Sequence, residues 1–171
     1  MVEGMKVMEY SIVQLTEKDW PQVSDIYLKG ILTKTATFET ECPDWYKWKM
    51  NRDLKTCIVA KVDQIIIGWA SVSKISSRCA YVGVGETSVY VHPNYIGNNV
   101  GFRLLKELVD LSEENSYWTL QANIFAENIS SIKIHEKNGF RIVGGREKIG
   151  QVNGIWKDNI LMERRSGKIG R

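Results

Sequence analysis

The sequence predicts an α/β fold of the mixed α+β kind, with helices on both faces of one sheet. The chain has 171 residues, 43% of them hydrophobic, which is enough for one domain with a sizeable core. Strand-like and helix-like segments alternate along it without a repeat, a low-complexity tract or a linker. Residues 86–108 pass from an alternating strand through a turn with Pro and Gly into an amphipathic helix. We therefore expect a single domain over residues 1–171, with its core in residues 11–166.

Composition narrows the class of protein. No apolar run approaches the roughly 20 residues of a membrane helix, and the N-terminus has no secretion-signal pattern, so we expect a cytoplasmic protein without membrane contact. Three widely spaced cysteines and two histidines match no zinc spacing, which argues against metal sites and disulfides. The formal charge of +3 is mild and the basic residues are dispersed, which indicates a small anionic ligand rather than nucleic acid.

The first predicted elements are a strand and a helix. Residues 11–14 read as a short strand. Thr16 and Asp19 have the spacing of a capping box and open the helix. Its apolar residues share one face that packs on the core, and they are Val23, Ile26, Tyr27 and Ile31.

A loop, a second helix and a hairpin follow. Residues 35–43, T-A-T-F-E-T-E-C-P, read as a loop, and Asp44 is placed to cap a Trp-rich helix over residues 45–52. Residues 56–61 and 65–74 are rich in β-branched residues and are separated by a short turn, V-D-Q. This pattern predicts two strands joined as a hairpin.

The middle of the chain continues the sheet and adds a strongly amphipathic helix. Residues 81–91 and 118–124 are predicted strands. Between them, residues 100–112 form a helix with apolar residues at helical spacing. The inward residues are Val100, Leu104, Leu105, Leu108 and Leu111.

The last elements are a short helix and two strands. Ser130 is the predicted cap of the helix, which ends at Gly139, a residue type common at helix C-termini. Residues 140–143 and 154–163 then read as the final strands.

The turn before the 100–112 helix is a candidate anion site. Gly97 and Gly101 let the backbone approach a ligand closely, and the free N–H groups of a helix start favour negative charge by about 0.3–1 kcal/mol. A pyrophosphate fits such a cradle. An ordinary helix-start turn is the alternative for this segment taken alone.

Several blocks, in the same order along the chain, resemble a known family. The segment 89–108 and the later N-I-S-S-I-K-I-H-E-K-N-G-F resemble the GNAT superfamily of acetyl-coenzyme A dependent N-acetyltransferases. Within it, T-A-T-F-E-T, E-T-S-V-Y-V-H-P, W-T-L-Q-A-N-I-F-A-E-N, H-E-K-N-G-F-R-I-V-G and W-K-D-N-I-L-M-E-R-R-S are similar to the phosphinothricin and methionine sulfoximine acetyltransferases. The resemblance implies a mostly antiparallel sheet with a splayed strand pair that holds coenzyme A, and it also implies a homodimer.

The turn departs from the superfamily pattern of Arg or Gln, two residues, Gly, one residue, and Gly or Ala. This chain has Ile96, Asn99 and Gly101 at the marked positions. Asn tolerates a positive φ better than other non-glycine residues, so we expect the turn to persist. Ile96 offers no cation or amide to a phosphate, so we expect weaker binding that depends on backbone amides.

The resemblance also implies which residues contact acetyl-coenzyme A. The amides of residues 89–91 would bind the pantetheine arm, and the Val91 amide is the candidate to stabilise the oxyanion formed when an amine attacks the thioester. Asn128 matches a position that binds the arm in relatives, with a turn or cap as its alternative role. The expected contacts are Val89, Tyr90, Val91, Gly97, Asn98, Asn99, Val100, Gly101, Phe102, Asn128 and Ser131.

Two residues are candidates for proton transfer. Glu86 can take the proton of a substrate ammonium directly or through water, or it can only anchor the ammonium by charge. His135 stands where many GNAT enzymes have a proton-donating tyrosine, and an imidazole with the ordinary pKa of about 6.5 can protonate the departing thiolate. A purely structural histidine is the alternative.

The substrate site departs from the relatives as well. They tend to carry Y-R-x-T-V-E before the E-x-S-V-Y-V block, with the Arg and Thr near the substrate carboxylate, whereas this chain has Val82 and Val84 there. A carboxylate partner is therefore missing unless Arg78 replaces it. Glu39 could do work similar to that of Glu86 from the opposite loop, with Phe38 as an apolar wall beside it; a capped loop with one anchored aromatic ring is the alternative. The full set of expected contacts is Phe38, Glu39, Arg78, Glu86, Thr87 and Ser88.

The sequence thus predicts an N-acetyltransferase that acts on a small primary amine by direct attack in a ternary complex. Cys57 and Cys79 have no visible His partner for an acyl-enzyme route. Two alternatives remain: a coenzyme A binding module with little catalysis, and an acetyltransferase that modifies protein N-termini or lysines.

Overall fold

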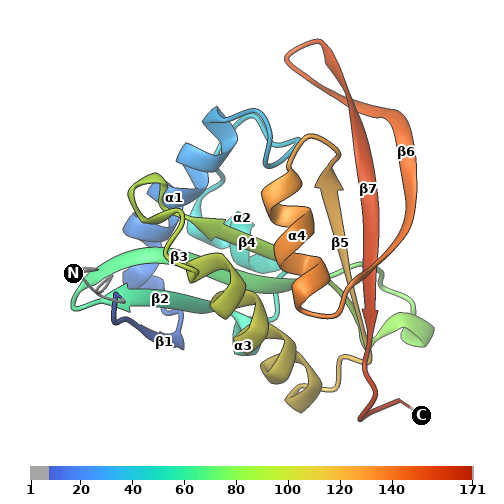
Figure 1. The fold of residues 1–171 in the computed structure, drawn as a ribbon. Coiled ribbons are helices and arrows are strands. Elements are labelled where there is room, and N and C mark those ends of the chain that lie inside the picture. Colours follow the sequence, from blue (N-terminus) through green and yellow to red (C-terminus); the bar gives the residue numbers. More distant parts are fainter. Residues whose placement is uncertain (1–7, 171) are drawn as a thin grey trace, which may run out of the picture.

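The computed structural model describes residues 8–170, which form a seven-stranded mixed sheet in the order β1-β2-β3-β4-β5-β7-β6 (Figure 1). Neighbouring strands are antiparallel except for β4 and β5, which are parallel. This confirms the predicted fold class. The strands are β1 (Ser11–Gln14), β2 (Ile58–Val62), β3 (Ile65–Lys74), β4 (Val84–Val91), β5 (Thr119–Phe125), β6 (Arg141–Val152) and β7 (Ile155–Arg165).

Helices cover both faces of the sheet. In Figure 1, α3 and α4 lie before the sheet, on what is called the front face here, and α1 and α2 lie behind it, on the back face. No helix in the described part of the chain is long and apolar enough to cross a membrane. The helices are α1 (Trp20–Leu32), α2 (Trp45–Met50), α3 (Val100–Glu114) and α4 (Ile129–Lys137), with short 3-10 turns η1 (Glu17–Asp19), η2 (Leu54–Thr56), η3 (Cys79–Tyr81) and η4 (Pro93–Tyr95).

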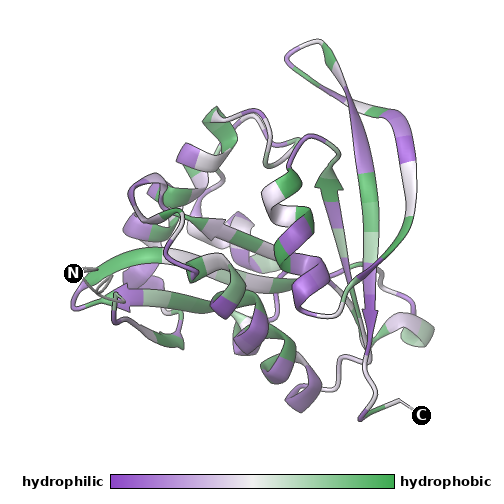
Figure 2. Ribbon diagram, viewed as in Figure 1, coloured by the Kyte–Doolittle hydropathy of each residue, from purple (hydrophilic) through white to green (hydrophobic). Residues whose placement is uncertain are grey.

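The two faces have cores of different composition. The front core is mainly aliphatic and is centred on Leu104, Leu105 and Leu108 of α3, which are fully buried. Figure 2 shows hydrophilic residues along the outward side of the same helix. The back core is rich in aromatic rings, among them Trp48 of α2 and Trp69 of β3, whose centroids lie 5.5 Å apart. Both cores exclude water from the sheet between them.

Helix caps decide where the helices begin. The Thr16 amide and hydroxyl both donate to Asp19 Oδ2, at 2.8 and 2.9 Å, which confirms the predicted capping box. Asp44 accepts from the Lys47 amide at 2.8 Å and caps α2 as predicted. The predicted cap at Ser130 is wrong. Asn128 caps α4 by accepting from the Ser131 amide at 3.2 Å, because its longer side chain reaches that N–H group from one residue before the helix.

Two strands differ from their predicted bounds by more than two residues. Strand β4 starts at Val84 rather than at residue 81, because the chain first makes the turn η3 and then places Gly83 so close to Trp118 that a Cβ would lie 2.2 Å from the ring. Strand β6 runs to Val152 although its residues are polar and rich in glycine. Pairing with β7 holds it in place, with register shifts at two points, so tertiary contacts override its weak strand propensity.

Strands β4 and β5 separate partway along their length. Their register contains the pairs Val84–Thr119, Gly85–Leu120 and Glu86–Gln121, and it ends there. The rest of β4, residues 87–91, remains paired with β3 on its other side. The two strands therefore leave an opening in the sheet, called the split below, that begins at Glu86.

Candidate active site

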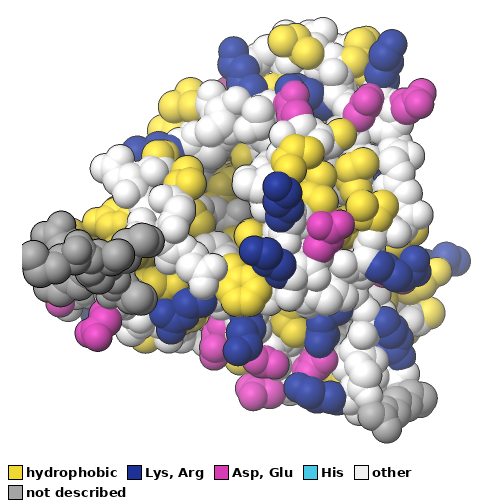
Figure 3. Space-filling view, viewed as in Figure 1, with side chains coloured by type: hydrophobic (Ala, Val, Ile, Leu, Met, Phe, Trp, Pro, Cys, Tyr) yellow, Lys and Arg dark blue, Asp and Glu magenta, His cyan; other side chains and the backbone are white. Residues whose placement is uncertain are grey.

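A cleft of about 330 Å³ lies at the split. A second cavity of about 510 Å³ lies next to it, and the residues that line both include Glu39, Arg52 and Glu86. Figure 3 shows the molecule hollowed beside α4, with Lys and Arg side chains near the hollow. The cleft brings together many residues that the sequence singled out, namely Phe38, Glu39, Glu86, Thr87, Ser88, Val89, Tyr90, Asn128, Ser131 and His135.

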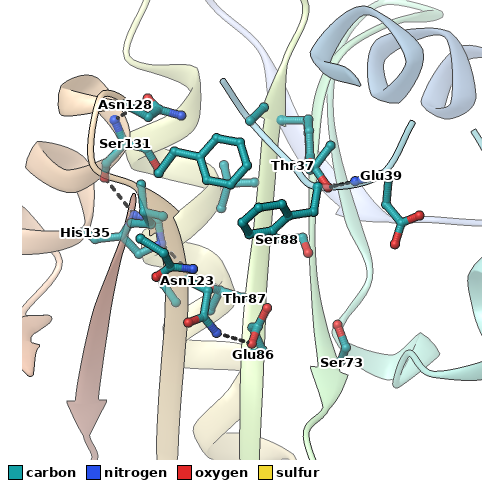
Figure 4. A pocket seen from close by; sticks show the side chains of 18 of the residues that line it. Thr37, Glu39, Ser73, Glu86, Thr87, Ser88, Asn123, Asn128, Ser131 and His135 are labelled. Carbon is teal, nitrogen blue, oxygen red and sulfur yellow. Dashed lines mark hydrogen bonds between the residues drawn. The ribbon is translucent and has the colours of Figure 1, made fainter. Parts of the chain in front are cut away.

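Successive residues of β4 face opposite sides of the sheet at this point. Tyr90 stacks on Trp69 in the back core at 4.7 Å between centroids, so Glu86 and Ser88, an even number of residues away, also face the back. Thr87 faces the front, where its hydroxyl lies 3.3 Å from Nε2 of His135 on α4. Glu86 and Thr87 are neighbours in the chain, but they belong to two separate sets of polar groups on opposite faces of the sheet (Figure 4).

Glu86 is held by two neutral donors from β5. Its Oε2 accepts from Asn123 Nδ2 at 2.6 Å (Figure 4). The same oxygen accepts from Gln121 Nε2 at 3.2 Å. Both bonds go to one oxygen, and Oε1 makes no hydrogen bond within residues 8–170. The carboxylate is therefore fixed in direction and keeps one oxygen for a ligand. The sequence did not predict either amide, although strict alternation along residues 119–125 places both on the face of Glu86.

His135 is a buried and neutral imidazole. It is 3% exposed, and its Nδ1 lies 2.8 Å from the Ser131 carbonyl, which can only accept a hydrogen bond. Nδ1 therefore carries the proton, and Nε2 accepts from the Thr87 hydroxyl. Burial lowers the pKa of His135 to about 4. The expected ordinary pKa near 6.5 is wrong, because desolvation penalises the charged ring, and no imidazolium is present at neutral pH.

Arg52 was missed by the sequence analysis. Its guanidinium lies on the back face, where Nη1 donates to the hydroxyls of Ser71 at 2.7 Å, Ser73 at 3.3 Å and Ser88 at 3.4 Å. Its Cζ is 4.6 Å from the Trp48 ring centroid. Burial lowers the pKa of Arg52, but a guanidinium keeps its charge in proteins. No periodic pattern marks this residue, since it stands just after the end of α2 and reaches the site through the fold.

The residue expected to replace the missing carboxylate partner lies elsewhere. Arg78 is exposed and lines neither cavity, so the expectation that it contacts the substrate is wrong. The reason is that the exposed turn η3 stands between Arg78 and the start of β4 at Val84. Val82 is 68% exposed, and it too lies outside both cavities.

The loop after α1 forms the outer wall of the cleft. The Phe38 ring meets Phe125 of β5 edge to face, with centroids 4.6 Å apart. On its other side, a Cβ on Gly150 of β6 would lie 2.7 Å from that ring, so a glycine is needed for this approach. Glu39 follows as an exposed carboxylate that lines both cavities. The predicted roles of Phe38 as an apolar wall and Glu39 as an opposing acid are thus compatible with their positions.

Only some of the β4 backbone N–H groups that were expected to face a ligand do so. The bond from His92 N to Ile67 O, 2.9 Å long, makes Gly68–Val91 a non-hydrogen-bonded pair of the antiparallel ladder. The N–H groups of Val91 and Val89 therefore point away from β3, toward the split. Tyr90 alternates with them and bonds to β3, so the expectation that its amide also faces a ligand is wrong. Its ring is buried with Tyr27 at 5.0 Å between centroids.

The start of α3 is an open cradle of amides. Asn99 has a φ of +62°, which confirms that it supports the turn, and Gly97 has a φ of +89°. The first helical bond runs from Arg103 N to Asn99 O, so the N–H groups of Val100, Gly101 and Phe102 precede it without an acceptor among the described residues. A Cβ on Gly101 would lie 3.4 Å from Val91, which places the cradle beside the end of β4.

Comparison with known proteins agrees with this geometry. A model of the acetyltransferase (GNAT) family matches residues 11–140. A phosphinothricin N-acetyltransferase of Alcaligenes faecalis is 32% identical over 155 residues, which are 86% of this chain and 78% of that protein.

Two solved structures share the fold along most of their length. One is a GNAT superfamily phosphinothricin acetyltransferase of Sinorhizobium meliloti in complex with acetyl-coenzyme A, with TM-score 0.85, 27% identity, and coverage of 94% of this chain and 90% of that one. The other is a ribosomal-protein-alanine N-acetyltransferase of Brucella melitensis, with TM-score 0.85, 29% identity, and coverage of 91% and 99%. The family match over most of the chain and the 32% identical relative show that this protein is an N-acetyltransferase of the GNAT family.

Proposed function

We propose that the enzyme transfers the acetyl group of acetyl-coenzyme A to the primary amine of a small molecule, an amino acid or an analogue such as phosphinothricin or methionine sulfoximine. The observation that carries this proposal is the position of Glu86. Its carboxylate is fixed by two amides where the split begins, and it borders both cavities. The relatives named for such substrates support the same class of acceptor.

The groups on the front side fit coenzyme A. The free amides at the start of α3 and the positive end of the helix dipole suit its pyrophosphate. The N–H groups of Val89 and Val91 along the split suit the amides of its pantetheine arm, and the Asn128 side chain lies at the same cleft. Acetyl-coenzyme A supplies the activated acetyl group as a thioester.

On the back face, Glu86 is the group that accepts the proton of the substrate amine. An ammonium does not attack a carbonyl until it loses a proton, and the carboxylate lies within the cleft where that nitrogen would bind. On the front side, Thr87 and His135 form a neutral pair in which the hydroxyl donates to Nε2. A thiol with a pKa near that of cysteine, about 8.5, leaves readily as a thiolate, so this side needs no strong acid. We assign His135 the role of orienting the Thr87 hydroxyl.

Direct transfer is favoured over an acyl-enzyme. None of the three cysteines lines the cleft. Burial raises the pKa of Cys57 to about 12, so its thiol is not a nucleophile at neutral pH. The amine and the thioester would therefore react in one ternary complex.

Assembly and location extend the same proposal. Exposed apolar residues on the long β6–β7 hairpin support a homodimer, and they are Ile142, Val143, Ile149, Ile155 and Trp156. The three cysteines are free, which supports a reducing compartment such as the cytoplasm. Sedimentation at several protein concentrations tests the dimer.

The test combines binding with a substrate screen. Isothermal titration with acetyl-coenzyme A measures cofactor affinity, and thiol release is then followed over amino acids, phosphinothricin, methionine sulfoximine and simple amines. We expect micromolar binding and release with at least one small amine. Binding without release from any amine would reject the enzyme in favour of a coenzyme A binding module. Release only with an alanyl-initiated peptide would favour protein acetylation, which the Brucella melitensis relative is named for.

A further inference from the structure

Arg52 is a largely buried cation that forms no direct ion pair in the described part of the chain. Its hydrogen bonds go to serine hydroxyls, its Nε is buried without a partner, and it takes part in no ion pair within residues 8–170. Buried charges in proteins are normally paired, because desolvation of a lone charge is unfavourable. Glu86 does not fill this role, since its hydrogen bonds go to Gln121 and Asn123. Glu86 favours the charge on Arg52 through space, but the two groups form no direct ion pair, so each can still take an opposite charge from a ligand.

The two charges lie on one face and border the same space. The guanidinium of Arg52 donates to Ser73 of β3 and to Ser88 of β4. Ser73 lies opposite Glu86 in the β3–β4 register, and Ser88 is two residues from Glu86 on the same face of β4, so the guanidinium lies over the two strands next to Glu86. Both side chains line the cleft and the adjoining cavity. A ligand of a few heavy atoms can contact both at once.

We propose that Arg52 binds an anionic group of the substrate, so that the enzyme selects amines that carry a carboxylate or a similar anion close to the nitrogen. This inference rests on the proposed function and names its substrate class. The planar guanidinium matches a carboxylate through paired hydrogen bonds, as an ammonium group would not. With the carboxylate on Arg52 and the ammonium on Glu86, the nitrogen lies at the start of the split, where the thioester is expected. Arg52 then supplies the cation that relatives carry at the position of Val82.

The first test needs no variant. The best amino acid of the screen is compared with its own carboxamide, which keeps the amine and the side chain but removes the negative charge. We expect kcat/KM to be about 10- to 100-fold higher for the amino acid, the range for a hydrogen bond to a charged group. The amine of the carboxamide is the less basic one and so the more reactive at neutral pH, which makes this preference a stringent sign of carboxylate binding. Equal or faster turnover of the carboxamide would overturn the proposal and leave the acetyltransferase intact.

The second test removes the cation. Arg52→Met keeps the apolar stem against Trp48 and should lower kcat/KM for the amino acid about 10- to 100-fold, mainly through KM, whereas the loss for the carboxamide should be much smaller. Arg52→Lys should retain part of the preference, and the exposed Arg78→Met is the matched control and should behave as wild type. Equal losses for both substrates would show a structural role and overturn the proposal.

Folding and function are separated by two further measurements. Acetyl-coenzyme A affinity of Arg52→Met is expected to stay near wild type, because the lost contacts lie on the back face, and its unfolding midpoint shows whether the variant folds. If that variant does not fold, the wild-type substrate pair and Arg52→Lys decide the question. No thiol release from any amine by the wild type would instead reject the proposed function, and this substrate class with it.

Discussion

The two faces of the sheet carry different chemistry where β4 and β5 separate. The back face presents charges, Glu86 and Arg52, each held by neutral hydrogen-bond partners. The front face presents neutral groups, the buried His135 with Thr87 and the free amides at the start of α3. An amine arrives charged and must be recognised and deprotonated, whereas a thioester is neutral and its leaving group needs little help. The difference between the faces matches these demands.

This separation depends on the period of a β-strand. Glu86 and Thr87 are adjacent in the chain, but alternation sends their side chains to opposite faces. The split then allows both faces to be reached from one cleft. A shift of the register by one residue would exchange the two sets and remove the site.

The largest expected effect comes from the charged face. Glu86→Gln keeps the shape and a bond from Asn123 but removes the proposed base, so kcat should fall about 10²- to 10⁴-fold while acetyl-coenzyme A binding is unchanged. By contrast, His135→Gln should lower kcat less than about tenfold, because the thiolate leaves readily. Steady-state thiol release measures both, with the exposed Glu41→Gln as control for Glu86. Equal losses in the two variants would contradict the division of labour between the faces.

The neutral state of His135 predicts an intermediate effect on stability. The unfolded chain binds a proton at the ordinary pKa of about 6.5, whereas the folded ring does so only at about 4, so the unfolded state binds more protons in that window. Stability from this residue is complete above pH 6.5 and falls as the pH drops toward 4. Between pH 7 and pH 5 the free energy of unfolding should fall by roughly 2 kcal/mol through this residue.

Urea unfolding at pH 7 and at pH 5 measures this pH dependence of stability. His135→Gln should remove it, and His92→Gln, the change at the second histidine, should leave it in place. A wild-type protein that is equally stable at both pH values would show that His135 is charged or solvated in the folded state. The front face would then not be neutral.

The smallest expected effect concerns the amide cradle. Asn99 adopts a left-handed conformation, so Asn99→Ala should lower the free energy of unfolding by about 1 kcal/mol, whereas Asn99→Gly should be close to neutral. Both variants keep the N–H groups that precede the first helical bond. Calorimetric titration should therefore find acetyl-coenzyme A affinity preserved in Asn99→Gly. A large loss in that variant would show that the asparagine side chain, and not the backbone, binds the ligand.

The sequence by itself determined most of the elements and the parts of the site that depend on local rules. The capping box at Thr16 and Asp19, the cap at Asp44 and the turn at Asn99 were predictable because a few neighbouring residues decide them. Glu86 was predictable because it belongs to a block of the family motif. The long strand β6 was not, since its polar residues are extended only through pairing with β7.

Only the tertiary structure decided the electrostatics of the site. Gln121 and Asn123 reach Glu86 from β5, and Arg52 reaches the cavities that Glu86 borders from the segment after α2; no spacing in the sequence connects these two segments with β4. The neutral state of His135 follows from the burial of its ring between α4, Phe140 and Thr87 of β4, which a residue type cannot reveal. Local hydrogen bonds are encoded by neighbours in the chain, whereas charge and pKa depend on which distant groups exclude water from a residue. The amine-binding half of the site is therefore a property of the fold.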